Sequence, residues 1–185
     1  KPEILTHPNI PKPLHGLNPR IIKGQEWWDK TRRKAYESTD FHCVACGIHK
    51  SQAKKHQWLE AHEYFDINYY TGRCEVISIE PLCHYCHNFI HSGRLKMIMN
   101  KDKTKQEVIE ILEHGFKILS KHKLKAFPGT VDFAYDNRAK MFEVTSYNIK
   151  GNDYLKWSDY VLILEGKEYK SLYKNYEEWR NKYNR

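Results

Sequence analysis

The segment PLCHYCHNFIH, residues 81–91, combines two cysteines with three histidines in eleven positions. Cys83 and Cys86 form a C-x-x-C pair, the spacing with which a tight turn presents two thiolates to one metal ion. His87 and His91 are four residues apart, so on a helix their imidazoles lie on one face and can chelate a metal together. The segment therefore predicts a helix that carries two kinds of metal ligand.

A second C-x-x-C pair, Cys43 and Cys46, lies upstream, and 36 residues, positions 47–82, separate it from the first. Two such pairs can surround one zinc ion tetrahedrally, and Gly47 suits the tight turn that follows the upstream pair. A site closed by four thiolates has no open position for a substrate, so we expect this zinc to stabilise the fold. The predicted structural zinc ligands are Cys43, Cys46, Cys83 and Cys86.

Two further segments between the cysteine pairs indicate a β-hairpin. Trp58–Glu63 (WLEAHE) has alternating character and ends in polar residues, and Arg73–Ile79 (RCEVISI) is rich in residues that favour strands. We expect residues 56–95 to form a hairpin followed by a helix, with His62 at the end of the first strand. His62 would then face His87 and His91, so that three imidazoles and a carboxylate converge on a second metal ion.

In their order along the chain, these motifs resemble the HNH, or ββα-metal (His-Me finger), endonuclease family, in the form that carries two C-x-x-C pairs and a structural zinc. The resemblance covers about residues 41–95, a little over a quarter of the chain. It implies an α+β fold in which two strands and a helix hold one divalent ion. By position, His62 matches the strand ligand, Glu63 the general base, and His87 and His91 the helix ligands.

The chain departs from the family pattern at two positions. Glu63 stands where the family usually has a histidine base, and Ser78 stands where it usually has an asparagine. A solvated glutamate, with a pKa near about 4.3, is a weak base, but it is ionised at neutral pH and can orient or deprotonate a polarised water. A shifted alignment would instead make His62 the base and Glu60 or Glu63 a metal ligand.

The charge of the chain is compatible with a polyanionic partner. Lys and Arg number 31 against 23 Asp and Glu, which gives a formal net charge of +8 and a pI near 9.1. The resemblance implies DNA as this partner, with RNA as the alternative. Side chains near the motif could hold the phosphate backbone without reading sequence. These candidates are Lys50, Lys54, Lys55, Asn88, Arg94 and Lys96.

Composition excludes several classes of protein. Hydrophobic residues make up 40% of the 185 positions, including 13 Tyr and 5 Trp, which is too apolar for a disordered chain. The longest aliphatic run, Tyr160–Leu164, is far shorter than the roughly 20 residues of a membrane span. Five cysteines, with Cys74 outside the two pairs, are typical of a reduced metalloprotein. We therefore expect a cytoplasmic protein with no signal peptide and no membrane partner.

The expected architecture has three parts. Residues 1–24 are a Pro-rich extended arm, residues 25–126 hold the nuclease domain with its zinc turns and supporting helices, and residues 127–185 form a C-terminal extension. The extension can also belong to the same domain. Helices are predicted over about 24–37 and 105–123, the latter begun by a Thr104–Glu107 capping box. A hairpin over 160–172 and a final helix from Ser171 or Leu172 complete the prediction.

The leading functional hypothesis is a metal-dependent DNA endonuclease, a phosphodiester hydrolase with a one-metal HNH mechanism, of phage, restriction or mobile-element origin. Its cofactors would be a structural Zn²⁺ and a catalytic Mg²⁺, Mn²⁺ or other divalent ion. The alternative is a catalytically silent zinc-binding module that binds nucleic acid or a protein partner.

Overall fold

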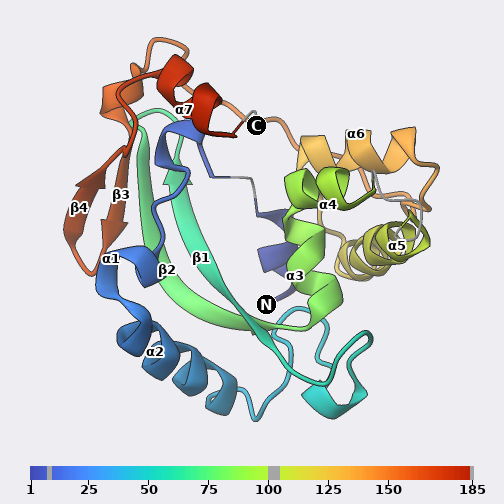
Figure 1. Ribbon diagram of the computed structural model, residues 1–185. Helices are drawn as coiled ribbons and strands as arrows, with labels where there is room; N and C mark the ends of the chain where they lie inside the picture. The colour runs from blue at the N-terminus through green and yellow to red at the C-terminus, as the bar shows by residue number, and fades with distance from the viewer. Residues whose placement is uncertain (8–9, 100–104, 184–185) are drawn as a thin grey trace. The chain divides into compact units, whose positions relative to one another are not determined.

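The computed structural model describes residues 1–7, 10–99 and 105–183 (Figure 1). Within these residues the chain is a mixed α+β protein with seven α-helices and one four-stranded sheet, which confirms the predicted class. No helix in the described ranges is long and apolar enough to cross a membrane. The helices are α1 Pro19–Lys23, α2 Gln25–Glu37, α3 His84–Ile90, α4 Ser92–Met99, α5 Lys105–Lys121, α6 Pro128–Asp136 and α7 Tyr176–Tyr183.

The four strands are arranged in chain order across the sheet, β1-β2-β3-β4. Strands β1 and β2 are joined by a short turn, β2 pairs with β3 in parallel, and β3 pairs with β4 antiparallel. The strands are β1 Glu60–Asn68, β2 Arg73–Leu82, β3 Val161–Leu164 and β4 Lys167–Lys170, and short 3₁₀ helices lie at Pro2–Thr6, Lys12–Leu14, Lys50–Gln52 and Trp157–Asp159.

The chain divides into two compact units. The first unit is composed of Lys1–Asn9, Lys34–His62 and Glu80–Asn148, and the second of Ile10–Arg33, Glu63–Ile79 and Ile149–Arg185. This division crosses all three parts expected from the sequence. All of the cysteines and histidines of the predicted metal sites belong to the first unit.

The core of the first unit forms where α3 packs against α4 and α5 (Figure 1). Helix α5 confirms the predicted helix over 105–123, and its apolar stripe, which includes Leu112 and Phe116, is fully buried. The Phe89 ring meets Phe116 edge-on, with 5.2 Å between ring centroids, and lies directly over Gly115. Glycine is required there because an added Cβ would lie 2.1 Å from the Phe89 ring. Thr104 of the predicted capping box lies outside the described residues.

The prediction of an extended N-terminal arm is wrong. The segment forms two 3₁₀ helices and α1, each with a proline in its first turn, where the missing N–H has no helical partner to lose. Ile4 and Leu5 are buried in the first unit, and Leu14 is buried in the second. Burial of these side chains favours compact turns over an extended chain.

The C-terminal hairpin of the second unit confirms the prediction. Strands β3 and β4 are joined by Glu165 and Gly166, which both have positive φ, as a two-residue type I′ turn requires. The final helix begins at Tyr176, later than predicted, because the Asn175 side chain accepts a hydrogen bond from Glu178 N and caps the helix there. Cys74 lies in the core of this unit, with Phe65 and Leu162.

Strand β1 is longer than the sequence predicted. His62 was expected to end it, but the strand continues for six more residues to Asn68. Tyr64, Phe65 and Ile67 favour strand structure, and pairing with β2 continues to the turn that begins at Asn68. His62 therefore lies near the start of β1, in the part of the strand that belongs to the first unit.

Candidate metal centres

The four predicted zinc ligands lie together in the first unit. Cys43 and Cys46 lie in a tight turn, in which Gly47 N donates to Cys43 O at 2.8 Å and Gly47 has a positive φ of 76°. Cys83 caps the N-terminus of α3, and Cys86 lies in its first turn. The four Sγ atoms are all within 4.8 Å of one another, and none of the cysteines forms a disulfide.

The geometry of this group fits zinc. Thiolates at about 2.3 Å from a tetrahedral zinc are about 3.8 Å apart, and Cys46 Sγ lies 3.8 Å from Cys83 Sγ. Hydrogen bonds from the other thiols hold the pKa of Cys43 far below its usual range, whereas contact with Cys43 and Cys46 raises the pKa of Cys83. Hydrogen bonds among the thiols therefore favour the thiolate form of Cys43, a role that a cation would fill for all four sulfurs.

The second predicted group, His62, His87 and His91, also comes together in the first unit. His62 comes from β1, His87 from α3, and His91 follows directly after the last residue of α3. The Nε2 atoms of His87 and His91 are 3.3 Å apart, and one ring nitrogen from each of the three residues lies within 4.8 Å of the other two.

His62 shows that this group fits a cation. Its side chain is 3% exposed, and neither ring nitrogen has a hydrogen-bond partner. Burial and the neighbouring histidines hold the pKa of His62 well below its usual value, and burial lowers the pKa of His91 to about 3. Both rings are neutral at pH 7, which is the form in which imidazole binds metals. A buried nitrogen without a partner is costly, and a bound cation would remove this cost for the His62 nitrogen that it binds.

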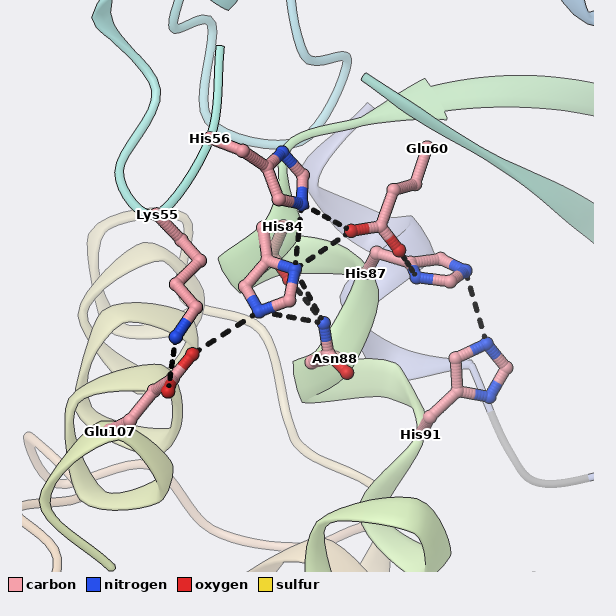
Figure 2. A network of polar contacts seen from close by, with 8 residues as sticks. All are labelled: Lys55, His56, Glu60, His84, His87, Asn88, His91 and Glu107. Carbon is pink, nitrogen blue, oxygen red and sulfur yellow. Dashed lines mark hydrogen bonds and ion pairs between the residues drawn. The ribbon is translucent and has the colours of Figure 1, made fainter. Parts of the chain in front are cut away.

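Glu60 is a carboxylate that contacts one of these histidines, His87 (Figure 2). One carboxylate oxygen, Oε2, lies 2.5 Å from His87 Nδ1, while His87 Nε2 is directed at His91. A carboxylate on the outer nitrogen of a histidine fixes the tautomer and ring orientation of a metal ligand. Burial opposes ionisation of Glu60, but contacts with His84 and His87 outweigh it and hold the pKa of Glu60 far below its usual value.

The two residues at which the chain departs from the HNH pattern lie on the strands. Glu63 follows His62 on β1, a strand in which adjacent side chains ordinarily point to opposite faces. Ser78 lies on β2 and is partly buried. Within the part of the chain that the structure describes, Glu63 is not among the residues grouped around His62.

The six residues predicted to contact nucleic acid have different environments. Asn88 is 1% exposed, and its amide nitrogen donates to His84 O at 2.9 Å. Lys55 forms an ion pair with Glu107 at 2.8 Å, and Arg94 is exposed on α4. The three other lysines lie over aromatic rings: Lys50 over Phe41, Lys54 over Tyr85 and Lys96 over Phe133.

Sequence reasoning did not select several histidines that surround these groups. The His7 ring meets the His62 ring edge-on at 6.0 Å, and His114 Nε2 lies 3.4 Å from Cys86 Sγ. His56 and His84 both contact Glu60. His84 could have been noticed because it lies inside the motif of residues 81–91, but no local pattern marks His7, His56 or His114.

Comparisons with protein-family models, curated proteins and solved structures returned no match for this chain.

Proposed function

We propose that this protein is a metal-dependent endonuclease of the HNH type, which hydrolyses phosphodiester bonds in DNA. The observation that carries the proposal is the convergence of His62, His87 and His91, in which both ring nitrogens of His62 are buried without a hydrogen-bond partner. Structural burial alone gives no reason to bring three imidazoles together. Three imidazoles with a position left open are a ligand set of catalytic metal sites.

In this proposal the four cysteines hold a structural zinc and the three histidines hold the catalytic ion. A divalent ion at the histidines would neutralise the charge that develops on phosphate oxygens during hydrolysis. Glu60 contacts Nδ1 of His87 and so directs Nε2 of that ring toward the site. The motif resemblance gives Glu63 the part of the base that accepts a proton from water.

The charge of the chain supports a nucleic-acid substrate. The net charge of +8 would attract a polyanion, and Arg94 is exposed on α4, two residues after the helix begins. Phosphate contacts by such side chains position a nucleic acid without selecting its sequence. Free thiols in the four-cysteine group suit a reducing compartment, so we place the protein in the cytoplasm.

Cleavage of supercoiled plasmid tests the proposal, with Mg²⁺, Mn²⁺ or Zn²⁺ added to protein that keeps its structural zinc. We expect metal-dependent cleavage that His62→Ala and His91→Ala both abolish. His122→Ala is the matched control, because His122 is exposed beyond the end of α5 and belongs to none of the metal-ligating groups. Absence of cleavage of DNA and RNA by the unaltered protein with all three ions would reject the nuclease.

One observation favours the alternative, a silent zinc-binding module that binds nucleic acid or a protein partner. The position that the resemblance assigns to the base holds Glu63, which, within the described residues, is not grouped with His62, His87 and His91. Retarded migration of DNA in a gel, without cleavage and with unchanged retardation in His62→Ala, would support this alternative. The nuclease proposal instead predicts that His62→Ala abolishes cleavage, even if the variant still binds DNA.

A further inference from the structure

A third group of metal-ligating side chains lies in the first unit, beside the two predicted from the sequence. It consists of His56, Glu60 and His84 (Figure 2). The three ligand atoms form a closed triangle: Glu60 Oε1 is 2.8 Å from His84 Nδ1 and 3.1 Å from His56 Nε2, and the two ring nitrogens are 3.1 Å apart. All three residues are partly buried.

When the Glu60 carboxylate is ionised, no placement of protons on the two ring nitrogens gives a hydrogen bond along every side of this triangle. If both ring nitrogens carry protons, Glu60 accepts two hydrogen bonds, but the two N–H groups face each other. If only one nitrogen carries a proton, the lone pair of the other faces the carboxylate oxygen. Each arrangement leaves one side of the triangle mismatched, whereas one cation accepts all three lone pairs.

His84 is oriented as metal ligands usually are. While its Nδ1 faces the triangle, its Nε2 lies 3.4 Å from Glu107 Oε1, and Glu107 is in turn paired with Lys55. Metal-bound histidines almost always contact a carboxylate or carbonyl through the nitrogen that does not bind the metal. The position of His84 at the start of α3, directly after Cys83, ties its backbone to the four-cysteine group.

His56 is also held with one nitrogen toward the triangle. Its ring stacks on Trp58 with parallel planes and 3.7 Å between centroids. Its Nδ1 is buried without a hydrogen-bond partner, whereas Nε2, the atom in the triangle, contacts both Glu60 and His84. The stacked ring therefore directs Nε2, and not Nδ1, at the other two ligand atoms of the triangle.

We propose that His56, Glu60 and His84 bind a divalent cation of the zinc type, such as Zn²⁺ or Co²⁺, in addition to the structural zinc and the ion at His62, His87 and His91. Two imidazole nitrogens and one carboxylate oxygen are a ligand set that zinc accepts, and three protein ligands leave a position open for water or a phosphate oxygen. This site goes beyond the one-metal function proposed above and does not depend on it.

Glu60 connects this site to the three-histidine group. Oε1 belongs to the triangle, and Oε2 contacts Nδ1 of His87, whose Nε2 is directed at His91. The same carboxylate therefore binds one cation directly and orients a ligand of the other. Both sites depend on the position and charge of the Glu60 carboxylate. A cation bound at one site is therefore expected to change the affinity of the other site for its cation.

Titration of the full chain with Co²⁺, with the structural zinc retained, tests the proposal. Visible d–d absorption and calorimetry count the bound Co²⁺, and the absence of thiolate charge-transfer bands shows that Co²⁺ has not replaced the zinc. We expect two equivalents in the unaltered protein and in His122→Ala, one in His56→Ala, one in His91→Ala, and none in the double variant. Glu107→Gln should keep two equivalents, one of them weakened by about 10–100-fold.

The proposal is overturned if the unaltered protein binds only one equivalent, or if His56→Ala binds two with unchanged affinity. Retained zinc and an unchanged circular dichroism spectrum establish that each variant is folded. Plasmid cleavage separates this proposal from the nuclease. If the unaltered protein cleaves plasmid but binds only one Co²⁺, the triangle site is rejected and the nuclease proposal stands. If it binds two Co²⁺ but does not cleave plasmid, the nuclease proposal is rejected and the triangle site stands.

Discussion

Glu60 Oε2 lies 2.5 Å from His87 Nδ1, so the carboxylate of β1 sets the orientation of an imidazole of α3. Glu60→Gln keeps the shape of the side chain but removes its charge. In a His56→Ala background, where only the three-histidine group is expected to bind Co²⁺, we expect the affinity of that group to fall by about 10–100-fold, the usual effect of losing such a partner. Calorimetric titration measures this change. Glu37→Gln, at an exposed position at the end of α2, is the control and should bind Co²⁺ normally.

The four-cysteine group should determine the stability of the first unit. Cys86→Ser should lose the zinc and unfold residues 41–95, because structural zinc contributes roughly 10–16 kcal/mol to the folding of small zinc domains. Zinc analysis and thermal melting followed by circular dichroism measure both effects. Cys74→Ala is the matched control, since Cys74 is buried in the core of the second unit, where burial raises the pKa of its thiol to about 12. This variant should keep its zinc. Full zinc occupancy in Cys86→Ser would contradict the assignment.

The packing of α3 on α5 should tolerate no side chain at Gly115. Gly115→Ala would place a Cβ 2.1 Å from the Phe89 ring, and we expect a loss of about 1–3 kcal/mol in the free energy of unfolding. Gly93→Ala in α4 is the control, because nothing lies within 4 Å of its added Cβ, and it should be neutral or stabilising by up to about 1 kcal/mol. Urea unfolding measures both variants. The double variant Gly115→Ala with Phe89→Leu should recover part of the loss if the clash with the ring is its cause.

The second unit should lose stability as the pH falls below about 6.5. Burial lowers the pKa of His15 below its usual value, and Trp179 Nε1 donates to His15 Nδ1 at 3.1 Å, which requires that nitrogen to be unprotonated. The unfolded chain therefore binds a proton at a higher pH than the folded chain does, and stability falls with decreasing pH in that window. The slope should be well below about 1.4 kcal/mol per pH unit, because the ring is only partly buried.

Urea unfolding at several pH values between about 7.5 and about 5.5 measures how the free energy of unfolding depends on pH. His15→Gln removes the titrating group and should flatten the profile relative to the unaltered protein, while Trp179→Phe removes the donor and should reduce stability above pH 6.5 most. A profile that is equally steep in His15→Gln would assign the dependence to other groups.

The sequence predicted the groupings that depend on local spacing. Cys83 and Cys86, or His87 and His91, are placed by one short segment, and the stripe of α5 follows from helical periodicity. His56 lies in a loop, and its position depends on the Trp58 ring and on Glu60. Such contacts leave no periodic signal in a single sequence.

The errors in the prediction have the same origin in contacts between distant residues. The N-terminal segment was expected to be extended because of its prolines, yet burial of Ile4 and Leu5 against the first unit determines its conformation. The length of β1 depends on its pairing with β2, which the residues around His62 do not encode. Pro-rich composition and strand-like patterns indicate local conformational preferences. The rest of the fold determines which distant segment packs against each region and so which conformation is stable.

Helix α3 has seven residues, and its side chains, with that of Cys83 before it, contribute to all three metal-ligating groups. Assembly should therefore have an order: the thiolates fix the first turn of α3, and only then do His84 and His87 acquire the positions in which they bind ions. By thermodynamic linkage the effect is reciprocal. If bound zinc raises the affinity of the histidine sites for their ions by some factor, ions at the histidines raise the affinity for zinc by the same factor. The affinity for zinc, measured at equilibrium by competition with a chelator, should consequently rise when Co²⁺ fills the histidine sites, which makes zinc affinity a measure of their occupancy.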